Sequence, residues 1–159
     1  MTYEEAAAAI TPGLYRHFKG NYYRVLSIAR HSETVQPMVV YRALYGDRGV
    51  WVRPAEMWDE VIERDGKTFQ RFRKLSMEER VTFYDNIYDE LRAVLDSEGR
   101  RKTLQEELQW KCDLLEEYYT SGEWRNDYEA DEAGLLPSGL KRSVLSQDGV
   151  YDLLTEWNR

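Results

Sequence analysis

The sequence is poor in the residues that most often build metal and redox sites. It has one cysteine, Cys112, and two histidines, His17 and His31, in 159 residues. A single cysteine excludes an intrachain disulfide, which favours a reducing compartment. One cysteine and two histidines do not make up a zinc ligand set, so we expect no metal and no cofactor.

Long hydrophobic runs are missing as well. No apolar segment approaches the roughly 20 residues that a membrane-spanning helix needs. The first residues, MTYEEAAAAI, are acidic and lack the basic start and long apolar stretch of a signal peptide. We therefore expect a cytoplasmic protein without a membrane partner.

Charge is distributed unevenly along the chain. Residues 1–75 carry 12 Lys/Arg and 9 Asp/Glu, a net +3, whereas residues 76–159 carry 10 and 20, a net −10. Hydrophobic residues at 42% and aromatics at 13% suffice for a packed core. The asymmetry indicates two modules that have different partners or that dock on each other.

The first half reads as a short helix followed by strands. Thr2 and Glu5 form a capping-box pattern before the alanines, so residues 1–12 should hold a short helix. Residues 13–75 alternate aromatic and β-branched segments with KGN, GDRG and DG turns, and AEMW after Pro54 reads as one helical turn. About five short strands in this length predict a small SH3-like β-barrel.

The second half, residues 76–159, reads as an acidic helical domain. Ser76 and Glu79 form a capping box, and apolar residues then recur every three or four positions up to Gly99. A second such stripe follows, and Ser146 caps a third helix. These patterns predict an α+β protein with a three-helix C-terminal domain, an antiparallel helical hairpin and an irregular acidic segment before the last helix.

Two long stretches resemble uncharacterised families. Residues 13–75, with GLYRHFKGNYYRVLSIARH, MVVYRALYGDRGVWVRPAEMW and DGKTFQRF, resemble the bacterial and phage family called domain of unknown function 1653. Residues 77–157, with LLEEYYTSGEWRNDYEADEAGLLPSGLKRSVLSQDGVYDLL, resemble domain of unknown function 4298, except that Ser143 stands where glycine is expected. The resemblance implies a β domain fused to a helical one and brings no activity, so function rests on the residues.

The segment VVYRALYGDRGVWVRP, residues 39–54, predicts a hairpin with two different faces. An even turn centred on Asp47 and Arg48 would pair residues so that one face is apolar and faces the core. That core face would consist of Tyr41, Ala43, Tyr45, Val50 and Val52. The other face would place Arg42 directly opposite Arg53, beside Trp51, and like charges in that position are unfavourable unless an anion lies between them.

Arg42, Trp51 and Arg53, joined by Arg30, are therefore the predicted ligand site. Two guanidinium groups beside an indole suit a phosphate or carboxylate attached to a flat ring, so we expect a small anionic, nucleotide-like ligand. Two other readings stay open. In one, the arginine side chains bind no ligand and their stems simply cover apolar surface. In the other, Glu129, Asp131 and Glu132 of the second half supply the counter-charge.

Catalysis and nucleic-acid binding rank lower. RHSET at residues 30–34 holds the residue types of a hydrolytic triad, but neighbours on a strand point to opposite faces. With no nucleophile, base or metal set in place, the sequence favours a non-enzymatic protein. A net −10 on the attached half would repel a nucleic-acid backbone, so a small ligand is favoured over a polymer.

An alternative function follows from the acidic second half. DYEADEAG, residues 127–134, alternates carboxylates as a calcium loop does, but it has Glu132 and Ser138 where that loop needs glycine and glutamate. A solvated acidic loop is the better interpretation. Its residues Asp127, Glu129, Asp131 and Glu132 could dock on a basic protein partner, and a homo-oligomer is also possible.

The second aromatic concentration has two readings. Tyr118, Tyr119, Trp124 and Tyr128 follow one another where the second helix ends. They would pack as core under the acidic segment, which we favour, or form a surface for a protein partner.

Overall fold

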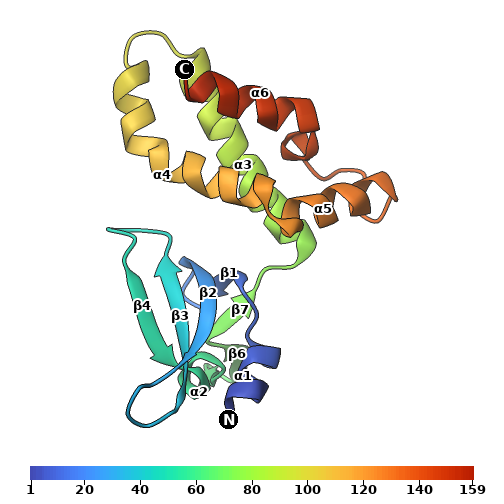
Figure 1. Ribbon diagram of the computed structural model, residues 1–159. Helices are drawn as coiled ribbons and strands as arrows, with labels where there is room; N and C mark the ends of the chain where they lie inside the picture. The colour runs from blue at the N-terminus through green and yellow to red at the C-terminus, as the bar shows by residue number, and fades with distance from the viewer. The chain divides into compact units, whose positions relative to one another are not determined.

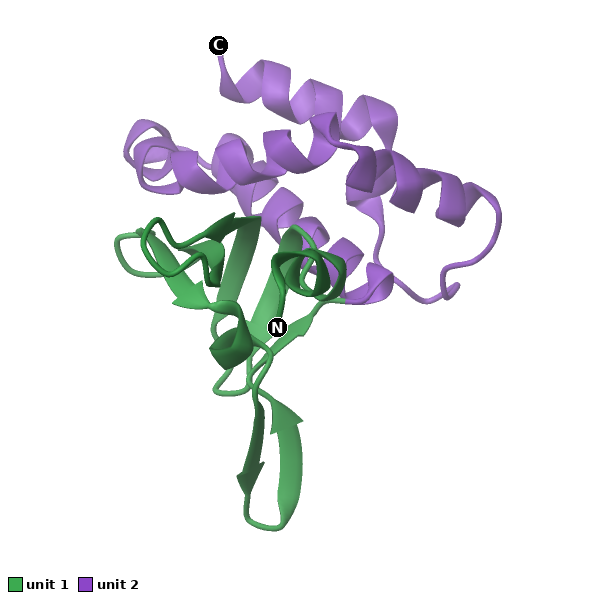
Figure 2. Cartoon of the chain, turned by 60° about the horizontal axis from the view of Figure 1, so that its bottom comes forward, with its two compact units in different colours: residues 1–75 green, residues 76–159 purple.

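The chain forms two compact units in a computed structural model that describes residues 1–159. Unit 1 comprises residues 1–75 and unit 2 comprises residues 76–159 (Figure 2). Unit 1 is built on antiparallel strands and unit 2 is helical, so the prediction of an α+β chain is confirmed (Figure 1). None of the helices is long and apolar enough to cross a membrane.

Unit 1 contains two helices and seven strands. They are α1 (Tyr3–Ala9), β1 (Gly13–His17), β2 (Tyr22–Arg30), β3 (Pro37–Ala43), β4 (Val50–Pro54), α2 (Ala55–Trp58), β5 (Val61–Arg64), β6 (Lys67–Gln70) and β7 (Phe72–Lys74). As the sequence predicts, the Thr2 side chain caps α1 by accepting a hydrogen bond from the Glu5 N–H at 3.1 Å, and α2 is a single turn after Pro54.

The sheet of unit 1 does not close into the predicted barrel. Five strands pair in the order β4-β3-β2-β1-β7, which leaves β4 and β7 as edges, and β5 pairs only with β6. The tight turn at Asp65 and Gly66, both at positive φ, folds the β5–β6 segment back on itself. This ribbon projects from the rest of unit 1 (Figure 2), so it does not join the two edges.

One face of the five-stranded sheet carries the core of unit 1. Trp58 of α2 stacks on Phe72 with ring centroids 3.7 Å apart and the rings 4° from parallel. Ala6 and Ile10, from α1 and its C-cap, complete the cover of this face. The buried cluster consists of Ala6, Ile10, Tyr15, Val25, Val39, Tyr41, Ala55, Trp58 and Phe72.

Unit 2 has four α-helices rather than the predicted three. They are α3 (Met77–Asp96), α4 (Arg101–Thr120), α5 (Gly122–Glu132) and α6 (Gln147–Trp157), with the 3-10 turn η1 (Ser143–Leu145) before α6. The Ser76–Glu79 capping box forms in full, and Ser146 caps α6. The additional helix, α5, occupies the segment predicted to be irregular.

Helices α3 and α4 form the predicted antiparallel hairpin. Tyr84 of α3 stacks on Tyr118 of α4 with centroids 3.8 Å apart and rings 3° from parallel. Glu90, farther along α3, accepts a hydrogen bond from the Lys111 Nζ at 2.6 Å, earlier along α4. The contacting residue number rises along α3, from Tyr84 to Glu90, while it falls along α4, from Tyr118 to Lys111. The two helices are therefore antiparallel.

Candidate functional site

The β3–β4 hairpin has a different register from the predicted one. Arg42 pairs with Val50, and Arg53 pairs with Val39. The connection is five residues long, Leu44–Arg48, with Gly46 at φ 60° and Arg48 at φ 56°. Because side chains alternate between the two faces along a strand, an odd connection in place of an even one puts the β4 residues on the faces opposite to the predicted ones.

Arg42 and Arg53 therefore lie on opposite faces of the sheet. Arg53 shares the face of Val39 and Tyr41, where its guanidinium carbon lies 5.5 Å from the centroid of the Phe72 ring. Trp51, directly opposite Tyr41, is on the same face as Arg53. The predicted cross-strand pair of Arg42 and Arg53 is wrong, whereas Trp51 and Arg53 do share one face of β4.

Arg30, the fourth residue of the predicted site, is held elsewhere. It ends β2, opposite Pro37, and its guanidinium carbon lies 3.8 Å from the centroid of the Tyr3 ring in α1. This short cation–π contact engages Arg30 with the N-terminal helix. The four predicted ligand-binding residues therefore do not form one cluster.

The register also divides the predicted core face. Tyr41 and Ala43 are buried as predicted. Tyr45, Val50 and Val52 are exposed, since Val50 and Val52 share the face of Arg42 rather than that of Tyr41. The prediction is wrong for these three residues because it assumed an even turn.

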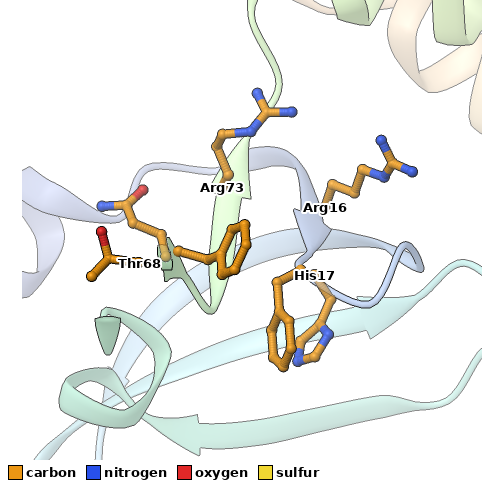
Figure 3. A pocket seen from close by; sticks show the side chains of 7 residues that line it. Arg16, His17, Thr68 and Arg73 are labelled. Atoms are coloured by element: carbon orange, nitrogen blue, oxygen red, sulfur yellow. The ribbon is translucent and has the colours of Figure 1, made fainter. Parts of the chain in front are cut away.

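A hollow of about 430 Å³ lies in unit 1, where β1, β6 and β7 meet. It is lined by Arg16, His17, Phe18, Thr68, Phe69, Gln70 and Arg73. The lining combines two guanidinium groups, three rings and two uncharged polar side chains, and it contains no carboxylate. Figure 3 shows Arg16 and Arg73 pointing to the same side of their strands, while the ring of His17 points to the other side.

Arg16 and Arg73 are direct neighbours across two strands. They are register partners in the β1–β7 ladder, so two like charges stand opposite each other. The Arg16 Nε donates to the Gly20 carbonyl at 3.4 Å, and its guanidinium carbon lies 5.6 Å from the Tyr22 ring centroid. Gly20, at φ 110°, forms the turn that brings this carbonyl to Arg16.

Phe18 is surrounded by further positive charge. The Lys19 Nζ lies 5.9 Å from the centroid of the Phe18 ring and the Arg64 guanidinium carbon lies 5.6 Å from it. Phe69, which also lines the hollow, is 40% exposed. The hollow therefore offers an accessible ring together with a positive potential.

His17 is a neutral ring at physiological pH. Burial, together with the positive charges of Arg71, Lys19 and Arg53, holds the pKa of His17 below its ordinary value. Its Nδ1 accepts a hydrogen bond from the Lys19 backbone N–H at 3.1 Å, so the ring carries its proton on Nε2. His31 has a similar role in a turn, since its Nδ1 accepts from the Glu33 and Thr34 backbone N–H groups.

The arginine pair at the hollow belongs to a longer row on the same face of the sheet. Arg24 and Arg42 are register partners in the β2–β3 ladder, and Arg24 pairs with Leu14, two residues from Arg16. The row thus runs over four adjacent strands through Arg73, Arg16, Arg24 and Arg42. In the sequence these residues appear as separate basic positions, because nothing local reveals which strands pair.

The acidic segment of unit 2 is helical, and its first carboxylate is buried. Asp127 is 0% exposed and accepts hydrogen bonds from the Arg80 Nε at 2.9 Å, the Arg80 Nη2 at 2.5 Å and the Tyr118 hydroxyl at 2.6 Å. Hydrogen bonding to Asp127 raises the pKa of Arg80, and burial raises that of Tyr118. The prediction that Asp127 meets a protein partner is wrong.

The other three acidic residues differ among themselves. Asp131 forms an ion pair with Arg142 of the same unit, whereas Glu129 and Glu132 are exposed on α5. No three His, Cys, Asp or Glu side chains come together as metal ligands. Of the four acidic residues predicted to dock on a basic partner, only Glu129 and Glu132 are exposed.

Two of the four clustered aromatic residues in unit 2 are core residues. Tyr118 and Trp124 are buried, and the Trp124 Nε1 donates to the Val144 carbonyl at 2.9 Å. Tyr119 and Tyr128 are half-buried, with their ring centroids 5.0 and 5.2 Å from that of Trp124. The core interpretation fits this cluster better than a partner surface.

Comparisons with known proteins agree with the division into two units. The family model described as "Protein of unknown function (DUF1653)" matches residues 13–74, and that described as "Domain of unknown function (DUF4298)" matches residues 75–159. A crystal structure of a DUF1653 protein from Bordetella bronchiseptica has 34% sequence identity, and the match covers 43% of this chain and 91% of that one at a TM-score of 0.41. No curated protein matches the chain.

Proposed function

The chain belongs to the DUF4298 family and carries a DUF1653 domain ahead of it, and we propose that it binds a small anionic ligand through that first domain. The ligand would have a phosphate or carboxylate group and a flat ring, as a nucleotide has. It would occupy the hollow at β1, β6 and β7. The protein would act as a binding protein rather than as an enzyme.

The observation that carries this proposal is the pairing of Arg16 with Arg73. Like charges directly opposite on a sheet cost roughly 0.2–1 kcal/mol. A phosphate or carboxylate of the ligand would lie between the two guanidinium groups and accept charge-assisted hydrogen bonds from both, since the guanidinium fork matches such a group in geometry. The proposed ligand has the same chemistry as the one predicted from the sequence, but the arginines that would bind it are Arg16 and Arg73 instead of Arg42 and Arg53.

The remaining lining suits the rest of such a ligand. Phe69 is exposed enough for a flat ring of the ligand to pack on it, and Thr68 and Gln70 would offer hydrogen bonds. The positive charges around Phe18 add to the local potential. The volume of about 430 Å³ lies within the range of roughly 300–1,000 Å³ that is usual for small-ligand sites.

Calorimetric titration of the full chain tests the proposal with a defined panel of inorganic phosphate, pyrophosphate, AMP and ATP. We expect at least one of these anions to bind and Arg16→Ala or Arg73→Ala to weaken its affinity by about 10- to 100-fold. This factor corresponds to roughly 1.5–3 kcal/mol for hydrogen bonds to a charged group. Arg16→Lys should lose part of the affinity, since it keeps the charge and loses the fork.

Arg42→Ala is the matched control, because Arg42 lies on the same face but two strands from Arg16. Strands are about 4.8 Å apart, so two strands separate Arg42 from Arg16 by about 10 Å, which inorganic phosphate or pyrophosphate does not span. If Arg42→Ala weakens binding as much as Arg16→Ala does, the ligand is an extended polyanion and the small-ligand proposal fails. Failure of the whole panel to bind would also contradict it.

A further inference from the structure

Strand β4 leaves one edge of the five-stranded sheet open. It pairs with β3 alone, at the end of the strand order β4-β3-β2-β1-β7 (Figure 1). Its residues Val50, Trp51 and Val52 are 52%, 59% and 61% exposed. Edge strands normally carry charges, proline or bulges that prevent pairing with another chain. In β4 these features, Arg53 and Pro54, are confined to the end of the strand, and Val50, Trp51 and Val52 carry none.

The hydrogen-bond pattern shows which backbone groups point outward. The Ala43 N–H donates to the Gly49 carbonyl at 3.1 Å, and the pairing of Tyr41 with Trp51 continues the same ladder. In an antiparallel ladder every second pair exchanges hydrogen bonds. Gly49 and Trp51 therefore direct their backbone groups toward β3, and Val50 and Val52 direct theirs toward the open edge.

We propose that β4 pairs with β4 of a second copy of this chain, in antiparallel orientation about a two-fold axis at Trp51. In this register Val50 of each copy exchanges hydrogen bonds with Val52 of the other, so the outward groups of Val50 and Val52 satisfy each other in four bonds. Trp51 faces Trp51 of the other copy. The five-stranded sheets join into one continuous sheet.

The side chains favour a second copy as the occupant. The register places Arg53 opposite Gly49 of the other copy, so it avoids pairing like charges across the new ladder. It also sets Val50 opposite Val52 and Trp51 opposite Trp51, so each exposed apolar residue of β4 gains an apolar neighbour from the other copy. A short strand pair buries less surface than a permanent dimer does, so we expect reversible association.

Sedimentation velocity of the full chain over about 5–500 µM tests the proposal, since a dimer of this kind must depend on concentration. We expect a monomer–dimer equilibrium in this range, and Val52→Lys should weaken it at least tenfold. Val61→Lys is the matched control, because Val61 lies on a strand of the same unit and is 60% exposed. A chain that is monomeric throughout, or a dimer that Val52→Lys leaves intact, would overturn the proposal.

Disulfide trapping tests the register itself. A disulfide between two identical chains forms readily only where a residue lies opposite the same residue of the other copy. The Trp51→Cys variant should therefore give a covalent dimer in high yield when it is oxidised. Val52 is 61% exposed, against 59% for Trp51, but it lies opposite Val50 of the other copy. The Val52→Cys variant should therefore give little covalent dimer. Native Cys112 is buried and should not contribute. Equal yields at the two positions would indicate random collision and contradict the register.

Discussion

The buried carboxylate of Asp127 should be the most sensitive polar position of unit 2. It is 0% exposed and accepts three hydrogen bonds, two from Arg80 of α3 and one from Tyr118 of α4. The side chain of Arg80 is itself only 13% exposed. Asp127→Ala thus leaves a buried hydroxyl without its acceptor and a mostly buried guanidinium with only the longer ion pair to Glu123, at 3.8 Å.

The cost follows from these contacts. Removing one partner of a buried ion pair destabilises a protein by about 3–5 kcal/mol, because the other charge remains buried. A folded unit of this length has a free energy of unfolding of about 4–13 kcal/mol, from roughly 0.05–0.15 kcal/mol per residue. We therefore expect Asp127→Ala to remove about a quarter or more of the stability of unit 2. Glu129→Ala, on the exposed side of the same helix, should cost under about 0.5 kcal/mol.

A double-mutant cycle with Tyr118→Phe makes the assignment specific. In the natural chain, loss of the Tyr118 hydroxyl should cost about 1.5–3 kcal/mol, the value of a hydrogen bond to a charged group. In the Asp127→Ala background the hydroxyl has already lost its acceptor, so the same change should cost nothing. Urea unfolding followed by far-UV circular dichroism measures both values, since the helices dominate that signal. Equal costs in the two backgrounds would refute the reasoning.

Two further predictions concern buried titratable groups of unit 2. Burial raises the pKa of Cys112 to about 12, and the residue is 1% exposed, so a thiol reagent at neutral pH should label it only after unfolding; labelling of the native chain at the rate of a free thiol would contradict this. Burial also raises the pKa of Asp85, whose Oδ1 accepts from the Val144 N–H at 2.9 Å while its Oδ2 has no partner. The folded unit therefore holds this proton more tightly than the unfolded chain, and the contribution of Asp85 to stability falls as pH rises from its ordinary value of 3.8 through the raised one. Urea unfolding at several pH values should show the natural chain losing stability relative to Asp85→Asn over that window, and a constant difference would argue against it.

Local sequence signals were sufficient for most helices of the fold. The capping residues Thr2, Ser76 and Ser146 predict the starts of α1, α3 and α6 because each side chain accepts a hydrogen bond within its own first turn. Such signals depend on neighbours in the chain. They can therefore be read without knowing the tertiary structure.

The sequence did not predict helix α5, because the contact that explains it joins residues far apart in the chain. Its buried side includes Asp127, which the sequence presents as one of several alternating carboxylates. Only the pairing with Arg80, 47 residues away, makes a buried aspartate acceptable at that position. The segment therefore reads as polar and irregular until its partner is known.

The candidate site depended on strand register and pairing, which the sequence does not determine. An odd five-residue connection in place of an even one separates Arg42 from Arg53. The arginine pair that does form, Arg16 with Arg73, joins the first and last strands of the sheet region of unit 1. Both residues are visible in the sequence, within LYRHF and RFRK, but their contact requires the pairing of β1 with β7.

Side-chain NMR of arginine tests the central claim most directly, because each Arg Nε–Hε group reports its own surroundings. The signals of Arg16 and Arg73, assigned through Arg16→Lys and Arg73→Lys, should shift in parallel when pyrophosphate is added to the full chain. Those of Arg30, Arg42 and Arg53 should stay in place. Shifts that appear at Arg42 and Arg53 instead, or no shift at Arg16 and Arg73 at saturating anion, would contradict the assignment of the ligand site to the hollow at β1, β6 and β7.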